Sequence, residues 1–284
     1  MKSYLLATIA AIFIAGCGNS DRSTDIAAND NAINDQEFED SASSETSDEI
    51  QTGAASTGET SGDPIGAAIL DPARTDEARA RDAGRKPDQV LKLAQIAPGQ
   101  TIVDIASSSD YYAPILSNIA GPDGQLIMIE PKRLEAFFPQ ALDSASAYAN
   151  GDDTDNIISI RTNLDEMSFA APVDRVLNIL YYHDTVWSGV DRAVMNKSIY
   201  DALKPGGFYL IIDHAAKAGS DESVTNDLHR IDPALVMAEV RAAGFVLAQE
   251  SELLANPDDP MEEGVFGALR GKTNRFSLLF RKPE

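Results

Sequence analysis

Four titratable side chains form two adjacent pairs, His183-Asp184 and Asp213-His214, and each pair directly follows an apolar segment of the strand type. If the two strands are neighbours in a parallel sheet, these side chains meet at one edge of it. Imidazole and carboxylate groups there can act as a general base, bind a divalent metal, or brace the loops by hydrogen bonds. The residues leave these three roles open. We take His183 and Asp184 as the catalytic candidates and assign no metal.

Short apolar segments alternate with helical segments along residues 64–284. The strand candidates cover residues 101–105, 125–129, 157–160, 173–180, 208–212, 245–247 and 276–280. Strands that are apolar on both faces and alternate with helices predict a parallel sheet covered on both sides, whereas the last two strands predict an antiparallel pair. The predicted fold class is therefore α/β, a Rossmann-like doubly wound seven-stranded sheet, mostly parallel, with an antiparallel C-terminal strand.

Capping residues and helix breakers set the expected helices. Thr75 can cap the first of two short helices within residues 71–97, and Pro87 suits the first turn of the second. Asp232 can cap a later helix that has Pro233 at its first position. Further helices are expected over residues 112–119, 134–149 with a kink or break at Pro139, and 191–203, followed by a turn over residues 203–207.

Several motifs stand at or near the ends of the predicted strands. They are Val103-Asp104-Ile105, Tyr111-Tyr112, Glu130, Tyr182-His183-Asp184, Leu203-Lys204-Pro205-Gly206-Gly207, Asp213-His214 and Arg270-Gly271-Lys272-Thr273. In this order they resemble the class I S-adenosylmethionine-dependent methyltransferases, in particular a bacterial subgroup with a Tyr-His-Asp element after the fourth strand. The resemblance covers about residues 71–283 and implies S-adenosylmethionine as the cofactor and methyl transfer to a small acceptor.

The resemblance also implies which residues contact the cofactor. Glu130, at the tip of the second strand, would accept hydrogen bonds from both ribose hydroxyls, although it could also be a solvated loop acid. The expected cofactor-binding residues are Asp104, Ala106, Ser108, Asp110, Tyr112, Glu130 and Tyr182. Tyr112 and Tyr182 are included because aromatic rings attract a sulfonium through cation–π interactions.

The loop after the first strand departs from the family pattern. Methyltransferases of this class usually place several glycines there, whereas this chain has Ala106-Ser107-Ser108-Ser109-Asp110. Positive backbone angles at these positions would cost free energy that glycine avoids. Either small serines still admit the cofactor along a different path, or the cofactor site has decayed.

Charge in the same loop discriminates between cofactors. Asp110, beside a predicted helix start, would repel the pyrophosphate of a dinucleotide but attract the sulfonium and ammonium of S-adenosylmethionine. Two further residues have less specific surroundings: we expect Trp187 to pack in the core and His229, next to Arg230, to lie on the surface.

Composition limits the partners of the protein. The 284 residues include 45 acidic and 23 basic side chains, which gives a net charge of −22. Such a charge repels phosphate, so nucleic acid and anionic membrane surfaces are disfavoured as partners. With 43% apolar residues, the chain can form one sizeable core. We therefore expect a small-molecule substrate; the sequence does not indicate an oligomeric state.

The N-terminal 63 residues differ from the rest of the chain. Met1-Lys2 and an apolar run over residues 4–14 precede Ile14-Ala15-Gly16-Cys17, which resembles the signal peptide and lipobox of bacterial lipoproteins. The resemblance implies cleavage after residue 16, lipidation of Cys17 and attachment to a membrane facing the periplasm. Residues 18–63 carry 12 acidic side chains against one arginine, so residues 17–63 are expected to be a lipidated, disordered linker.

Three function classes remain open after these observations, and the one ranked last is a metal-dependent hydrolase-like activity of the His-Asp cluster. The first is an S-adenosylmethionine-dependent methyltransferase, formed by residues 64–284 and tethered to a membrane through its lipid. The second is a non-catalytic module that binds a ligand or partner on a degenerate methyltransferase scaffold. The glycine-free loop, together with the cytosolic origin of the cofactor, keeps the second class open.

Overall fold

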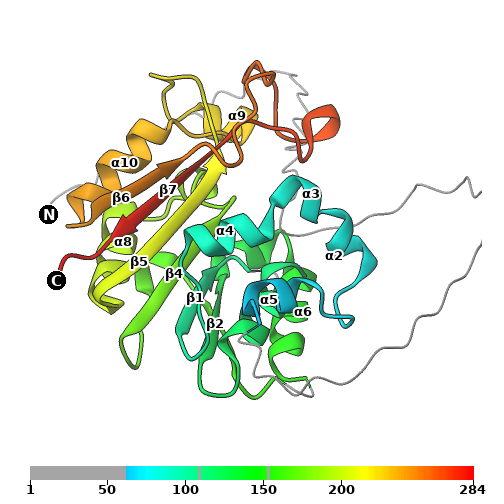
Figure 1. The fold of residues 1–284 in the computed structure, drawn as a ribbon. Helices are drawn as coiled ribbons and strands as arrows, with labels where there is room; N and C mark the ends of the chain where they lie inside the picture. The colour runs from blue at the N-terminus through cyan, green and yellow to red at the C-terminus, as the bar shows by residue number, and fades with distance from the viewer. Residues whose placement is uncertain (1–61, 108–109, 152–153) are drawn as a thin grey trace, which may run out of the picture.

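Strand β1 (Thr101–Ile105) lies in the interior of the sheet, where its mostly apolar residues are covered on both faces. The computed structural model describes residues 62–107, 110–151 and 154–284 (Figure 1). The other strands are β2 (Gln125–Pro131), β3 (Ile157–Thr162), β4 (Val173–Ile179), β5 (Leu203–His214), β6 (Val246–Ser251) and β7 (Arg275–Arg281). They form one sheet in the order β3-β2-β1-β4-β5-β7-β6.

The strand directions confirm the predicted fold class. Strands β1 to β5 pair in parallel, and β7 runs antiparallel to both β5 and β6. The chain first builds the sheet from β1 outward to β3 and then returns to add β4 on the other side of β1. This reversal makes the ends of β1 and β4 the topological switch point, where open α/β sheets bind ligands.

Helices cover both faces of the sheet, as Figure 1 shows. The helices are α1 (Pro64–Ile69), α2 (Asp76–Ala80), α3 (Asp82–Arg85), α4 (Pro87–Leu93), α5 (Tyr112–Ala120), α6 (Pro139–Ala149), α7 (Asp184–Trp187), α8 (Arg192–Ala202), α9 (Val224–Leu228) and α10 (Pro233–Ala242), with short 3-10 helices η1 (Lys132–Ala136), η2 (Leu164–Glu166) and η3 (Gly267–Leu269). One apolar cluster packs under α1, α4 and α5, and the other under α8 and α10. The sheet separates the two clusters, as expected for strands that are apolar on both faces.

The capping residues act as predicted, but the region before β1 contains more breaks. The Thr75 hydroxyl accepts a hydrogen bond from the Ala78 amide at 3.1 Å, and Asp232 caps α10 through the Ala234 amide. Lys86 adopts a left-handed conformation with φ 47°, so α3 ends before Pro87 begins α4. Two short helices were expected within residues 71–97. The structure has three there, α2, α3 and α4, and one more, α1, before them.

The break expected at Pro139 is present: the helix predicted over residues 134–149 is divided into η1 and α6, and Pro139 begins the second helix. One other boundary differs from expectation. Residues 203–207, expected as a turn, belong to the first part of β5, where Gly206 has φ 76°. Among the described residues, no helix combines the length and apolar composition needed to cross a bilayer. The predicted signal peptide and Cys17 lie outside the described residues.

Candidate active site at the strand ends

The loop after β1 begins with a left-handed residue. Ala106 has φ 56°, and its amide donates a hydrogen bond to the carbonyl oxygen of Ile129 in β2 at 2.8 Å. An L-residue in this conformation costs about 1–2 kcal/mol relative to a right-handed one. The turn that glycine usually makes in this fold is therefore made by alanine. Ser108, another expected cofactor residue, lies outside the described residues.

Asp104 is a buried acid at the same strand end. Asp104 is 3% exposed. By distance and angle, its Oδ2 atom has no hydrogen-bond partner among the described residues. The neighbouring Ser107 hydroxyl is buried in the same way. Burial raises the pKa of Asp104 to about 7, although hydrogen bonding to the Ser107 side chain and the charge of Arg85 oppose the shift. Two buried polar groups with few partners thus lie where the family resemblance places the cofactor.

Glu130 is the next-to-last residue of β2 and is 2% exposed. In the sheet it follows Ile129, the residue paired with Ile105 at the end of β1. The acid therefore lies at the adjacent strand end, as predicted from the sequence. Its burial rules out the alternative of a solvated loop acid.

The two tyrosines expected to line the cofactor site have different surroundings. Tyr112 begins α5 and packs edge-on against Tyr111, with ring centroids 4.8 Å apart. Tyr182 lies in the apolar cluster under α8 and α10, where its hydroxyl donates to Glu239 at 2.8 Å and accepts from Asn196 at 2.7 Å. The structure thus gives Tyr182 a bracing role, which corrects the expectation of a cofactor contact.

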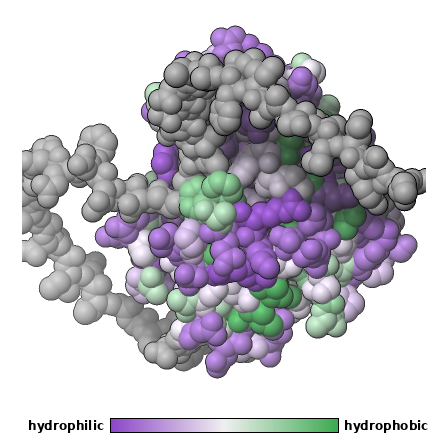
Figure 2. Space-filling model, turned by 180° about the vertical axis from the view of Figure 1, so that it is seen from behind, coloured by the Kyte–Doolittle hydropathy of each residue, from purple (hydrophilic) through white to green (hydrophobic). Residues whose placement is uncertain are grey.

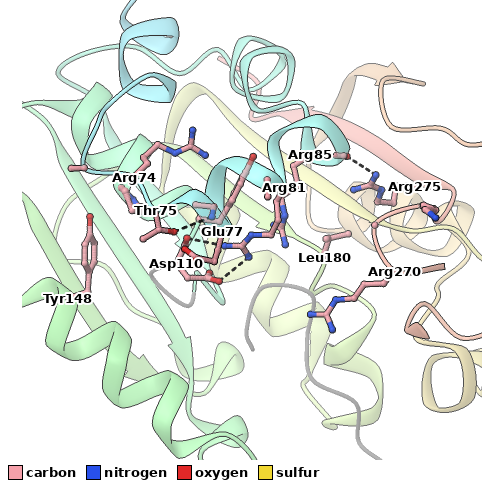
Figure 3. Close-up of a pocket in the computed structure, with 18 residues that line it drawn as sticks. Arg74, Thr75, Glu77, Arg81, Arg85, Asp110, Tyr148, Leu180, Arg270 and Arg275 are labelled. Carbon is pink, nitrogen blue, oxygen red and sulfur yellow. Dashed lines mark hydrogen bonds and ion pairs between the residues drawn. The ribbon is translucent and has the colours of Figure 1, made fainter. Parts of the chain in front are cut away.

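A cavity of about 790 Å³ lies between α2, α3, the start of α5 and the loop before β7 (Figure 3). It reaches Leu180 after β4 and Asp110 after β1. Its lining contains two acidic residues, Glu77 and Asp110, and six basic ones, which are Arg74, Arg81, Arg85, Arg270, Lys272 and Arg275. A basic cavity in a chain of charge −22 attracts small anions. Among the expected cofactor residues that the structure describes, only Asp110 lines it.

Tyr111 organises the arginines of this cavity. The guanidinium carbons of Arg74, Arg81 and Arg85 lie 5.5, 5.0 and 4.6 Å from the centroid of its ring. Asp110, next to it in sequence, forms a salt bridge of 2.9 Å with Arg81. Cation–π contacts and ion pairs fix the direction of long side chains that would otherwise be mobile.

The His-Asp pairs meet as the sequence predicted. Asp213 is fully buried and accepts hydrogen bonds from the amide and Nδ1 of His183 and from the amide of His214, each at 2.7 Å. The Nε2 atom of His183 lies 3.0 Å from Oδ1 of Asp184. Burial lowers the pKa of His183, but the carboxylates of Asp184 and Asp213 outweigh it and raise the pKa well above 6.5. The protonated ring lacks the free nitrogen of a general base.

His229 and Trp187 complete this cluster. Nδ1 of His229 lies 3.4 Å from Oδ1 of Asp184, and the His229 side chain is 12% exposed, so its predicted surface position is wrong. Arg230 is fully buried and pairs with Asp259 at 2.8 Å, which draws the segment inward. Trp187 packs edge-on against Phe137 and donates from Nε1 to Asp184 at 2.6 Å. Packing was expected for this tryptophan, but not the hydrogen bond.

No protein-family model and no curated protein sequence matches this chain. Solved structures do. An S-adenosylmethionine-dependent methyltransferase of Aquifex aeolicus is similar over 72% of this chain and 95% of its own, with a TM-score of 0.51 and 17% identity. A proposed sarcosine dimethylglycine methyltransferase of Galdieria sulphuraria is similar over 74% and 91%, with a TM-score of 0.51 and 14% identity. The chain has the Rossmann-like fold of these proteins.

A third similar structure shows that this fold hosts other chemistry. The cyclase SpnF matches 71% of this chain and 81% of its own, with a TM-score of 0.51 and 15% identity. Because one fold carries different activities, the function has to be argued from the residues of this site.

Sequence reasoning did not find His229 or the arginines of the cavity. The charged neighbour of His229 suggested solvent exposure, and only the fold brings α9 beside α7, the helix that follows β4. The arginines come from two segments, residues 74–85 and 270–275, which are far apart in the sequence. A cluster of four arginines within residues 74–85 was a visible signal.

The Ala106→Gly variant tests the strained turn after β1. We expect it to raise the free energy of unfolding by about 1 kcal/mol in urea titrations, because glycine adopts positive φ without a Cβ clash. The matched control is Ala147→Gly, at an exposed position inside α6, which should lower stability by about 1 kcal/mol. Equal destabilisation by both variants would contradict the left-handed conformation of Ala106.

Proposed function

We propose that this protein is a methyltransferase that uses S-adenosylmethionine and acts on a small anionic acceptor. One observation carries the proposal. Asp104 and Ser107 place buried polar side chains at the switch point of a methyltransferase-like sheet, and among the described residues neither Oδ2 of Asp104 nor the Ser107 hydroxyl has a hydrogen-bond partner beyond this pair. Leaving such groups unsatisfied costs about 1–3 kcal/mol each, and a polar ligand in this place would remove the cost.

The residues at the strand ends fit the groups that this cofactor carries. The Asp104 carboxylate can accept hydrogen bonds from an ammonium group, and Glu130 can accept two from ribose hydroxyls. Ala106 follows β1 with a left-handed backbone, and its small side chain limits steric blocking at this strand end. When bound, the cofactor supplies an electrophilic methyl group on a sulfonium. The chain's task is mainly to hold the acceptor in line with that methyl group.

The basic cavity is the proposed place of the acceptor. It adjoins the ends of β1 and β4 through Asp110 and Leu180, and six basic side chains line it. Arginine side chains bind carboxylate and phosphate groups with two parallel hydrogen bonds. A small carboxylate or phosphate compound therefore suits the cavity, whereas a cationic acceptor would be repelled.

In the proposed reaction, His183 and Asp184 have a positioning role and do not act as a general base. A protonated His183, fixed between Asp184 and Asp213, can donate a hydrogen bond but cannot remove a proton from the acceptor. Methyl transfer to an acceptor that is already anionic needs no such base. An acceptor that is already anionic also suits the basic lining of the cavity.

We also propose that the protein is a lipoprotein, anchored through Cys17 and facing the periplasm. The basis is the sequence around Ile14-Ala15-Gly16-Cys17 and the acidic, Ser-rich composition of residues 18–63. The exported location requires a supply of cofactor outside the cytosol. A non-catalytic binding module on the same fold is the alternative, and the absence of cofactor binding would support it.

Binding of S-adenosylhomocysteine tests the cofactor site. We expect calorimetry on the full-length protein to show binding that weakens about 10- to 100-fold in Asp104→Asn and in Glu130→Gln, because hydrogen bonds to charged groups contribute about 1.5–3 kcal/mol. Affinity of the wild type should rise with pH through about 7 as Asp104 ionises, and this rise should vanish in Asp104→Asn. Glu135→Gln, at an exposed acid of η1, is the control.

Two results would contradict the proposed cofactor site. If the wild type does not bind S-adenosylhomocysteine at millimolar concentration, the methyltransferase proposal fails and the binding-module alternative is supported. If binding is present but unchanged in both variants, the cofactor lies elsewhere on the protein.

The cavity predicts anion binding. We expect inorganic phosphate or succinate, at constant ionic strength, to raise the Tm of the wild type, because anions bind the folded state. The double variant Arg81→Gln/Arg270→Gln should weaken this binding at least about 10-fold through lost charge-assisted hydrogen bonds. Arg161→Gln, on β3 away from the cavity, is the matched control. Equal Tm shifts in all three proteins would exclude the cavity as the anion site.

The lipid anchor is tested in cells. We expect the wild type to be found in the membrane fraction with a lipid on Cys17. The Cys17→Ser variant lacks the thiol that accepts the lipid, so we expect it to keep its signal peptide or to appear in the soluble fraction. Fractionation and mass spectrometry of the mature N-terminus measure this. An unmodified Cys17 in the wild type would refute the anchor.

A further inference from the structure

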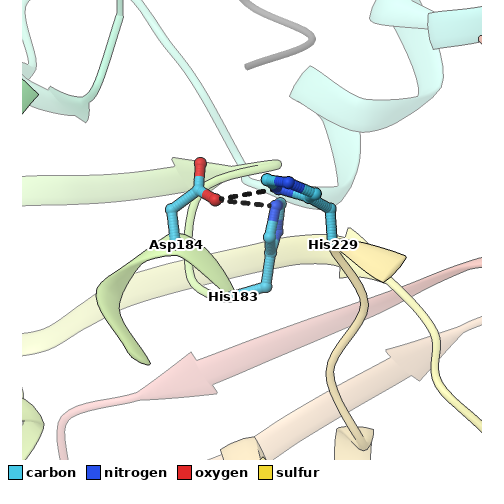
Figure 4. Close-up of side chains that lie close together, drawn as sticks. All are labelled: His183, Asp184 and His229. Carbon is cyan, nitrogen blue, oxygen red and sulfur yellow. Dashed lines mark ion pairs between the residues drawn. The ribbon is translucent and has the colours of Figure 1, made fainter. Parts of the chain in front are cut away.

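The structure gathers all three histidines of the chain into one cluster. The ring centroids of His214 and His229 lie 5.7 and 5.5 Å from that of His183, and these are the only histidines in 284 residues. Nδ1 of His214 is hydrogen-bonded to the Thr273 hydroxyl at 2.7 Å. The other two rings point toward Asp184, as Figure 4 shows.

Three atoms of this cluster are spaced like metal ligands. Nε2 of His183 and Nδ1 of His229 lie 3.0 and 3.4 Å from Oδ1 of Asp184, and ligand atoms of all three residues lie within 4.8 Å of one another. Zinc binds imidazole and carboxylate at about 2.0–2.2 Å, so two ligands of a tetrahedral site are about 3.3 Å apart. The two spacings to Asp184 are close to this value, and the bound of 4.8 Å lets the two imidazoles approach a common ion.

The surroundings hold two of these residues in a direction suitable for ligation. Nδ1 of His183 is bound to the buried Asp213 at 2.7 Å, which leaves Nε2 to face Asp184. Trp187 donates to Oδ1 of Asp184 at 2.6 Å. Metal-binding histidines commonly donate their second ring nitrogen to a carboxylate, and ligating carboxylates are commonly hydrogen-bonded in turn. Asp213 and Trp187 have these two roles here.

The third residue is held by the backbone and by an aromatic contact. His229 follows α9 with φ 52°, a left-handed conformation that a non-glycine residue rarely adopts. Its ring packs edge-on against Phe266, with centroids 5.0 Å apart. The strained backbone directs the ring at Asp184, and its 12% exposure leaves a path from solvent.

We propose that His183, Asp184 and His229 bind a divalent first-row transition metal through Nε2, a carboxylate oxygen and Nδ1. Two imidazoles and one carboxylate form a ligand set that suits zinc or ferrous iron and leaves a coordination position open. Each imidazole ligates through a deprotonated nitrogen, so any proton on that nitrogen is released to solvent when the metal binds. The proposal does not rest on the methyltransferase function, since none of the three residues is needed for the cofactor contacts of Asp104 and Glu130.

Zinc titration of the chelator-treated full-length protein tests this site. We expect one equivalent of Zn²⁺ to bind by calorimetry, and Co²⁺ to give the intense visible absorption of a four- or five-coordinate site. His229→Gln and Asp184→Asn should each weaken binding at least about 100-fold, because one of three ligands is lost. Asp213→Asn should weaken it about 10- to 100-fold, the usual effect of removing a partner that orients a ligand.

His214→Gln is the matched control, because His214 belongs to the same cluster but is bound to Thr273 rather than directed at Asp184. It should bind Zn²⁺ within about threefold of the wild type. Circular dichroism identifies any variant that fails to fold, and His229, the most exposed of the three, gives the variant that disturbs the core least. No stoichiometric zinc in the wild type would overturn the proposal, as would equal affinity in folded His229→Gln and His214→Gln. S-adenosylhomocysteine binding, measured separately, keeps the two sites distinguishable.

Discussion

The buried carboxylate of Asp213 joins the ends of two neighbouring strands. It accepts three hydrogen bonds, two from His183 after β4 and one from the amide of His214 at the end of β5. A buried charge is tolerated only when it is well satisfied, so this carboxylate fixes both loops. The direction of the His183 ring, and with it the whole His-Asp cluster, depends on that arrangement.

Charge is distributed unevenly in this protein, and the distribution matters for function. The chain as a whole is strongly acidic, yet the cavity at the strand ends is lined mainly by arginine and lysine. Figure 2 shows a mostly hydrophilic surface with scattered apolar patches on the face opposite to that of Figure 1. This distribution supports the proposal of a small anionic acceptor, because a local basic cavity favours small anions whereas the overall negative charge repels large polyanions.

The fold accommodates a departure from the usual glycine pattern at a moderate energetic cost. Ala106 makes the left-handed turn after β1, while the parallel pairing of β1 with β2 and β4 keeps its neighbours in place. Strain of this size persists where the surrounding structure over-determines the backbone, and it is often found at functional sites. Ala106 adopts positive φ without being glycine, whereas Ser108 and Ser109 of the same loop lie outside the described residues.

The sequence by itself determined the strands, their order of appearance and the residues at their ends, because apolar periodicity and capping are local properties of the chain. It thus placed Asp104, Glu130 and the His183-Asp184 pair correctly. Only the tertiary structure decided that Tyr182 faces α8 and α10, that His229 turns inward, and that arginines from two distant segments share one cavity. These placements depend on how helices and loops pack across the sheet, which no local pattern encodes.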